Sequence, residues 1–85
     1  MNMTYINKFE IQGVVSCIRA EEDATKFFLH VEVIDQKDGI DMRSSAAVSC
    51  QCAPGTSLKD GQVVHVSGHF IGYDVWVNCF LTIEK

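Results

Sequence analysis

The 85-residue sequence has no long apolar run and few basic residues. Its first eleven residues mix polar and charged side chains with apolar ones, so we expect neither a signal peptide nor a membrane span there, and no other stretch approaches bilayer length. Seven Lys and Arg oppose eleven Asp and Glu, for a formal net charge of −4. Because Lys and Arg supply most of the affinity for polyanions, this balance disfavours binding to nucleic acid by charge alone.

Catalytic and phosphate-binding motifs are also missing. The sequence has no set of nucleophile, base and orienting residue, no phosphate-cradling glycine loop and no metal-binding motif. The acidic run at residues 21–23 falls between two strand-like segments, where a charge run is usually a solvated loop. We therefore expect a protein that is not an enzyme and that carries no cofactor.

The four cysteines do not form the pattern of a disulfide framework. Without an export signal we expect a reducing, cytoplasmic environment and free, buried thiols. Cys50 and Cys52 form a C-x-C pair, and with Cys79 and a histidine they offer a possible zinc site. Strand alternation instead directs both members of the pair into the core, where cysteine is a common small apolar residue, so we expect no metal.

What the sequence does contain is a repeated alternation of apolar and polar residues. This pattern predicts β-strands at residues 8–18, 26–35, 42–52, 62–70 and 74–83. The Asp38-Gly39 pair predicts a tight hairpin between the second and third strands. We expect the following residues to face the core: Phe9, Ile11, Gly13, Val15, Cys17, Phe27, Leu29, Val31, Val33, Ser44, Ala46, Val48, Cys50, Cys52, Val64, Val66, Gly68, Phe70, Val75, Val77, Cys79, Leu81 and Ile83.

Five strands with short turns are compatible with an SH3-like barrel, a small open meander or an oligonucleotide/oligosaccharide-binding (OB) barrel. Gly13 stands in the middle of a long first strand, where a strand shared by both halves of an OB barrel must bend. The segment 58–61 then leads into a valine-rich strand that ends at Gly68. We therefore predict an all-β fold, a five-stranded Greek-key OB barrel with little or no helix, with residues 1–85 as one domain.

Several strand segments carry a resemblance to a known family. The pieces INKFEIQGVVS, KFFLHVEV, SSAAVSCQC, LKDGQVVHVSGHF and VNCFLTIEK resemble the strands of bacterial single-stranded DNA-binding proteins, and still more those of the smaller primosomal replication protein B group. The resemblance implies an OB barrel that dimerises or tetramerises and binds single-stranded DNA through stacking aromatics and basic loops. The partners it implies are single-stranded DNA or RNA, a second copy of the chain and a replication protein.

Two loops depart from this family pattern. Residues 21–23 are acidic where a basic loop is expected, and the connection at residues 71–74 is short where the family has a long basic one. Both departures shift the expected binding surface from the loops to the face of the sheet.

On that face, alternation places Lys26, Phe28, His30 and Arg43 outward on the second and third strands. Trp76 and Phe80 point outward from the fifth strand, and Tyr73 lies in the loop before it. Aromatic rings there can stack on unpaired bases while cations follow the backbone. The alternative is that Phe28, Trp76 and Phe80 form a subunit interface or a second small core. His65 and His69 share the outward side of the fourth strand, where we expect ordinary exposed polar residues.

Three functions follow from these features. The first is a module that binds single-stranded DNA in replication, recombination or a mobile element, as a dimer joined by an edge strand or by the hairpin around Asp38-Gly39. The second is a protein-interaction module in a larger complex, which the acidic balance favours. The third, binding of a sugar or other small ligand, has no specific residue behind it, because the fold alone does not fix function.

Overall fold

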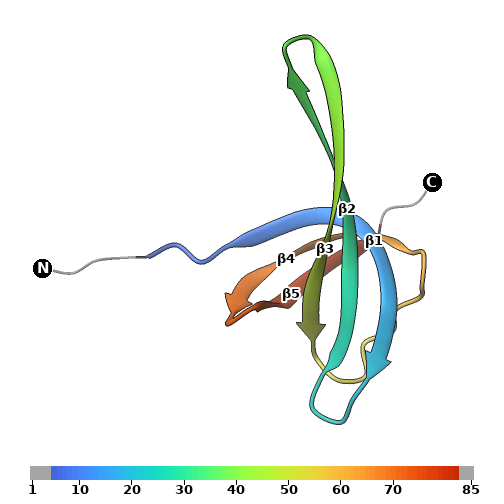
Figure 1. The fold of residues 1–85 in the computed structure, drawn as a ribbon. Coiled ribbons are helices and arrows are strands. Elements are labelled where there is room, and N and C mark those ends of the chain that lie inside the picture. The colour runs from blue at the N-terminus through green and yellow to red at the C-terminus, as the bar shows by residue number, and fades with distance from the viewer. Residues whose placement is uncertain (1–4, 83–85) are drawn as a thin grey trace, which may run out of the picture.

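The computed structural model describes residues 5–82, which form five β-strands and contain no helix. The strands are β1 (Phe9–Ala20), β2 (Thr25–Lys37), β3 (Ile40–Cys52), β4 (Val63–Ile71) and β5 (Asp74–Thr82). They close into a barrel in the order β1-β2-β3-β5-β4 (Figure 1). The prediction of an all-β, five-stranded barrel is confirmed, with longer second and third strands than expected. The described residues contain no helix that is long and apolar enough to cross a membrane.

Strand pairing gives the barrel its Greek-key order. Every neighbouring pair is antiparallel except β3 and β5, which run parallel and meet only at Cys50↔Val75 and Gln51↔Trp76. Because β5 inserts between β3 and β4, the loop from β3 to β4 crosses one end of the barrel. Two backbone hydrogen bonds tie that loop to β1, from Gly61 N to the Val15 carbonyl and from Val15 N to the Gln62 carbonyl.

The first strand is shared by both halves of the barrel, as predicted. Residues 9–14 pair with β4, and residues 14–20 pair with β2, so the strand changes partner at Val14. A Cβ atom on the preceding residue, Gly13, would lie 2.4 Å from the carbonyl oxygen of His30. The backbones of β1 and β2 therefore approach so closely here that only glycine fits.

The core contains most of the side chains that alternation directs inward. Nine of them are at most 4% exposed: Val15, Phe27, Leu29, Cys50, Cys52, Val64, Val66, Val75 and Val77. Leu58, from the loop before β4, packs against this cluster, as do Phe9, Ile11 and Val48. The predicted burial of the C-x-C pair is confirmed.

Two β-bulges reverse the predicted alternation beyond them. In β1 the register shifts between Ser16 and Arg19, and Cys17 has a φ of +53°. As a result Cys17 is exposed and Ile18 packs against the core, the opposite of the predicted arrangement. An extra residue in one strand turns every later side chain to the other face.

The second bulge lies between β4 and β5, where the register shifts between Ser67 and Gly68. Beyond it Cys79 and Leu81 are exposed, although alternation predicted them inward. Phe80 points toward the core instead, with its ring centroid 5.9 Å from that of Phe27. The predicted outward position of Phe80 is therefore wrong. Ile83 lies outside the described residues.

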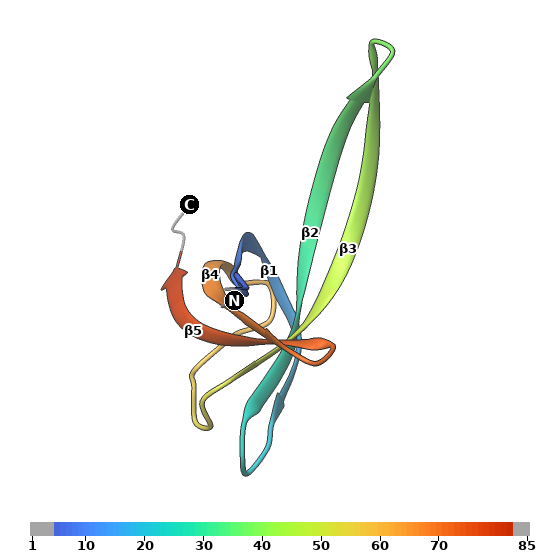
Figure 2. The same ribbon diagram turned by 90° about the vertical axis from the view of Figure 1, so that its left-hand side faces the viewer.

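Residues 31–46, here called the arm, extend β2 and β3 away from the barrel as a two-stranded hairpin (Figures 1 and 2). The hairpin turns at Asp38 and Gly39, which both have positive φ, as the Asp-Gly pair predicted. The prediction that alternate residues of the arm face the core was wrong, because Val33, Ser44 and Ala46 are exposed and only Val31 is half-buried. Phe70, at the end of β4, is also 48% exposed and packs edge-on against Phe9 instead of entering the core.

Candidate nucleic-acid interface

A row of polar and aromatic side chains crosses the outside of the barrel. The strand register aligns the row as Arg19↔Lys26 between β1 and β2, Lys26↔Gln51 between β2 and β3, Gln51↔Trp76 between β3 and β5, and Trp76↔His69 between β5 and β4. The neighbours of these residues along β2, β3 and β5 are buried, so the row itself faces outward. Phe28 lies two residues beyond Lys26 on the same side of β2.

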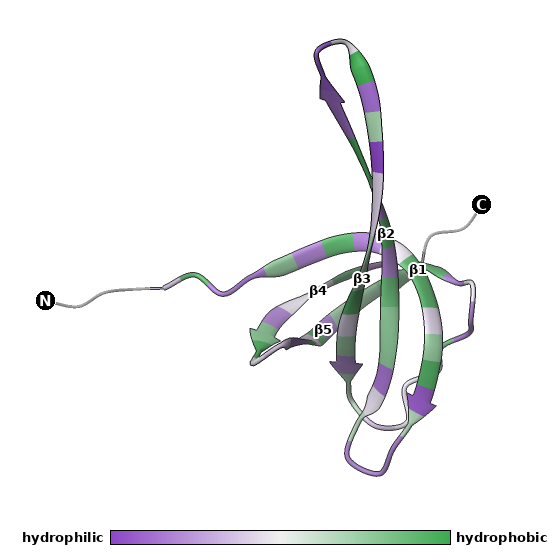
Figure 3. Ribbon diagram, viewed as in Figure 1, coloured by the Kyte–Doolittle hydropathy of each residue, from purple (hydrophilic) through white to green (hydrophobic). Residues whose placement is uncertain are grey.

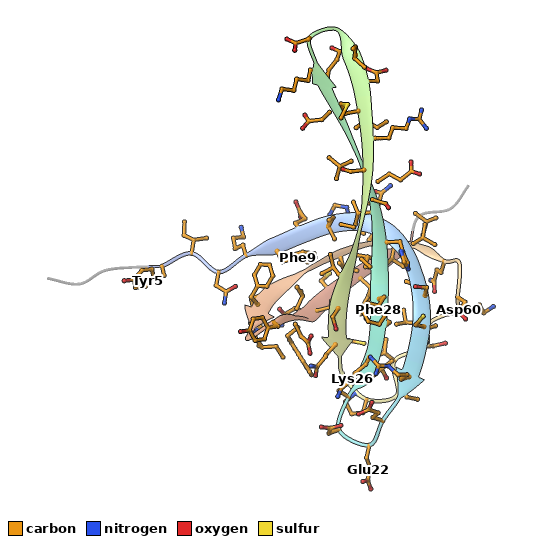
Figure 4. All side chains as sticks on the ribbon, in the orientation of Figure 1. Tyr5, Phe9, Glu22, Lys26, Phe28 and Asp60 are labelled. Atoms are coloured by element: carbon orange, nitrogen blue, oxygen red, sulfur yellow. The ribbon has the colours of Figure 1, made fainter. Side chains whose placement is uncertain are left out.

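We call Arg19, Lys26, Phe28, Gln51 and Trp76 the sheet face. Figure 4 shows Lys26 and Phe28 along β2, with Glu22 at the tip of the β1–β2 turn. The guanidinium carbon of Arg19 lies 5.9 Å from the centre of the Phe28 ring. This cation–π contact joins a positive charge to an aromatic surface, which is the combination that binds an unpaired base and its phosphate.

Two carboxylates moderate the positive charge of the sheet face. Glu21 Oε1 lies 3.1 Å from Lys26 Nζ, so the acidic turn partly neutralises the lysine. Asp74, at the start of β5, accepts a hydrogen bond of 2.6 Å from Gln51 Nε2. That bond, a second one from Ser49 and the nearby charges of Lys26 and Arg19 hold the pKa of Asp74 below its usual range. The two cations of the sheet face therefore lie beside two carboxylates.

The predicted site residues do not all meet on this face. Lys26, Phe28 and Trp76 are brought together there, and His30 is exposed on the same side of β2, next to the arm. Tyr73 is fully exposed in the β4–β5 turn, three residues before Trp76. Phe80 turns inward, and Arg43 lies on the arm, six residues from the Ser49 that pairs with Phe28. At the usual strand rise that separation is about 20 Å.

Two members of the sheet face were missed from the sequence. Strict alternation from Val15 and Cys17 places Arg19 on the inner side, and only the bulge at Cys17 turns it outward. Gln51 has no charge or ring to attract notice, and its role depends on its contact with Asp74. A charged residue assigned to the core of a small barrel is the one sequence signal that would have revealed the bulge.

The three histidines lie on the outer surface in different surroundings. His30 has Val14 and Ala47 as its strand partners. His65 Nε2 lies 3.3 Å from Glu10 Oε2, and His69 Nδ1 lies 3.1 Å from Asn78 Oδ1. His65 and His69 thus bridge β4 to its two neighbours, β1 and β5.

The thiols of the C-x-C pair are held in the core. Burial, followed by the nearby charges of Asp74 and Cys52, raises the pKa of Cys50 to about 12. Burial also raises the pKa of Cys52. Cys79 is exposed, so it does not join the two buried thiols, and no group of three potential metal ligands lies together within residues 5–82.

The fold is similar to that of known protein structures. Against the protein PriB from Ralstonia solanacearum the TM-score is 0.71, at 8% sequence identity, over 94% of this chain and 100% of that one. A second structure of Ralstonia PriB gives 0.61 at 9% identity, over 93% and 100%. Against the SSB of Plasmodium falciparum, solved in complex with ssDNA, the TM-score is 0.69 at 15% identity, over 99% and 100%.

The sequence matches no protein-family model and no curated protein. At identities of 8–15% these structural likenesses establish the fold alone. They agree with the strand order and closure described above, and the chain is an OB-fold barrel.

Proposed function

We propose that this barrel binds single-stranded DNA on its sheet face. The observation that carries the proposal is the outward row of Arg19, Lys26, Gln51 and Trp76, with Phe28 beside it. Phe28 on β2 and Trp76 on β5, with β3 between them, provide surfaces for two bases, at about 1–3 kcal/mol for each stacked base. Arg19 and Lys26 pair across β1 and β2 beside Phe28, where they can contact the phosphates of the bound strand.

The structural neighbours support the same function. The Plasmodium SSB with a similar fold was solved with ssDNA, and PriB has a similar barrel of the same extent. By analogy we propose a role in DNA replication or recombination, in the cytoplasm, as a homodimer that also contacts a replication protein. The proposed function includes no enzymatic step and no cofactor. RNA with unpaired bases offers the same stacking surfaces and is the alternative ligand.

Fluorescence titration with oligo-dT at low salt tests the proposal. We expect quenching of Trp76, the only tryptophan, and a dissociation constant in the micromolar range or tighter. Phe28→Ala should weaken binding by about 1–3 kcal/mol, the value of one stacked base. Phe70→Ala is the matched control, because Phe70 is an exposed ring at the Phe9 end of β4 and is not part of the sheet face.

Absence of binding at low salt would reject the proposal, since weak screening leaves no ionic reason for failure. Equal losses in Phe28→Ala and Phe70→Ala would show that the ligand contacts some other surface. Oligo-rC and oligo-rU, titrated in parallel, decide between DNA and RNA.

A protein-interaction module is the second candidate, and the charge balance of the sheet face favours it. Glu21 and Asp74 offset Lys26 and Arg19, which suits a mixed-charge protein surface better than a polyanion. If the barrel is a protein-interaction module, a pulldown with the wild-type protein recovers a stoichiometric protein partner and a pulldown with Trp76→Glu does not. Oligonucleotides then bind neither the wild type nor the variant. Oligonucleotide binding that is lost in Trp76→Glu supports the first function instead.

A further inference from the structure

The arm presents an apolar face that nothing in the described chain covers. The register of β2 and β3 places Val31 with Ala46, Val33 with Ser44, Asp35 with Met42 and Lys37 with Ile40. These four pairs lie on the same side of the hairpin as Phe27 and Leu29, which face the core where β2 is part of the barrel. Figure 3 shows apolar residues recurring along the arm as far as its tip.

The exposure of this face distinguishes it from ordinary surface strands. Val33 is 45% exposed, Met42 57% and Ile40 64%, and β1 stops pairing with β2 at His30, before the arm begins. An isolated two-stranded hairpin is marginally stable in water, and covering its apolar face is the usual means of stabilising it. Clustered apolar side chains on a projecting element typically mark a contact surface.

The charges of the arm indicate what covers it. Glu32, Asp35, Asp38 and Asp41 outnumber Lys37 and Arg43, so the arm repels a nucleic-acid backbone. Its apolar face carries only two charges, Asp35 and Lys37, which have opposite signs and lie two residues apart on β2. The face is therefore neutral, and its charge pattern complements itself.

We propose that the arm is a dimerisation surface, packed face to face against the arm of a second copy. A two-fold axis at the level of the Gln36↔Asp41 pair places Asp35 opposite Lys37 of the second copy. The same axis places Met42 opposite Ile40 of the second copy, and each contact occurs twice, as in any isologous interface. The opposite side of the arm carries Glu32, Arg43, the Gln36–Asp41 hydrogen bond and a single large apolar side chain, Ile34, and stays in solvent.

The proposal rests on the homodimer of the proposed function and gives it a location, but it does not depend on nucleic-acid binding. With this axis only the outer halves of the two arms overlap, so each copy contributes about four residues of the face, Asp35, Lys37, Ile40 and Met42, against the 20–30 of a standard interface. The dimer is therefore a weak one, with a dissociation constant on the order of 100 µM. The sheet face lies at the other end of β2, so both surfaces are available at once.

Sedimentation equilibrium of two charge variants tests the arrangement. Asp35→Lys and Lys37→Glu should each weaken self-association about tenfold or more, because each places like charges opposite one another. An equimolar mixture should recover the wild-type affinity, since the lysine introduced in one variant then lies opposite the glutamate introduced in the other. Arg43→Glu is the matched control for Lys37→Glu, with the same charge change on the opposite side of the arm, and should associate like wild type.

Circular dichroism confirms that each variant is folded. A wild-type chain that stays monomeric up to about 500 µM, well above the expected dissociation constant, overturns both the dimer and its location. Dimers that persist unchanged in both charge variants leave the homodimer standing but overturn the arm as its surface. Oligo-dT titration at nanomolar protein, where the chain is monomeric, reports separately on the nucleic-acid function.

Discussion

Asp74 is one of the two carboxylates beside the sheet face that oppose the proposed function. Its carboxylate lies beside the sheet face, bound to Gln51, and its pKa is lowered mainly by the hydrogen bonds from Gln51 and Ser49. It is therefore fully ionised at neutral pH. A nearby anion weakens every phosphate contact that Arg19 and Lys26 make, by an amount that salt reduces.

Replacing Asp74 with Asn removes this charge and keeps an oxygen that accepts the hydrogen bond from Gln51. We expect oligo-dT to bind Asp74→Asn about two- to fivefold more tightly at low salt, the scale of one partly exposed charge pair. The gain should shrink in 0.5 M salt, measured by the same Trp76 fluorescence. Asp60→Asn, an exposed change of equal charge in the loop before β4, is the control. Weaker binding by Asp74→Asn would mean that the carboxylate contacts the ligand itself.

The four thiols differ sharply in burial, which predicts their reactivity. Cys50 and Cys52 are in the core, with pKa values raised by burial, whereas Cys17 and Cys79 are exposed. Because the thiolate is the reactive form, iodoacetamide at pH 8 should label two cysteines in the native protein and four in urea. Peptide mass spectrometry identifies which two. Rapid labelling of Cys50 in the native state would contradict the placement of β3.

Among the elements, β1 and β4 each carry a strict steric requirement for glycine. A Cβ at Gly13 meets the His30 carbonyl at 2.4 Å, and one at Gly68 meets the Trp76 carbonyl even more closely. In both places two backbones approach without room for a side chain, where β1 changes partner and where β4 is bulged against β5. These two glycines fix how sharply the sheet curves.

Gly13→Ala should therefore destabilise the barrel by about 2 kcal/mol or more, through displacement of β1 from β2. Urea unfolding measures the loss. Gly55→Ala is the comparison, because Gly55 has open space around it and only its φ of +80° opposes a side chain, at a cost of about 1–2 kcal/mol. A Gly13→Ala variant as stable as wild type would show that the two strands are farther apart than described.

The strands themselves were predictable from alternation, and so were the turn at Asp38-Gly39 and the bend at Gly13. The side of the strand on which residues beyond a bulge lie was not predictable. One extra residue at Cys17 or near Asn78 reverses the alternation, and the composition of the strand does not reveal it. That is why Arg19 was missed and Phe80 was placed outward. The arm was also unforeseen, since Val33 and Met42 alternate in the same way whether or not anything covers them.

In the molecule as a whole, few cations are available to bind a polyanion. The sheet face has only Arg19 and Lys26, one of them paired with Glu21, and the chain carries a net charge of −4. Binding must therefore depend on stacking more than on release of counterions. With two phosphate contacts, the slope of log K against log salt should be about −1.4, from −0.7 for each contact to a single strand.

Titrations between 50 mM and 500 mM salt measure this slope. Lys26→Ala should reduce its magnitude by roughly 0.7, the contribution of one phosphate contact, while Lys59→Ala, in the loop before β4, should leave it unchanged. A slope several times steeper would indicate that cations outside the sheet face take part.

Chemical-shift mapping of ¹⁵N-labelled protein with oligo-dT at low salt locates the ligand most directly. We expect the perturbed amides to cluster on the sheet face, at Arg19, Lys26, Phe28, Gln51 and Trp76, together with the Trp76 indole. Amides of the arm and of the residues through which β1 pairs with β4, at 9–14 and 63–68, should keep the chemical shifts of the free protein. Perturbations confined to the arm, or none at saturating oligonucleotide, would contradict single-stranded DNA binding on this face.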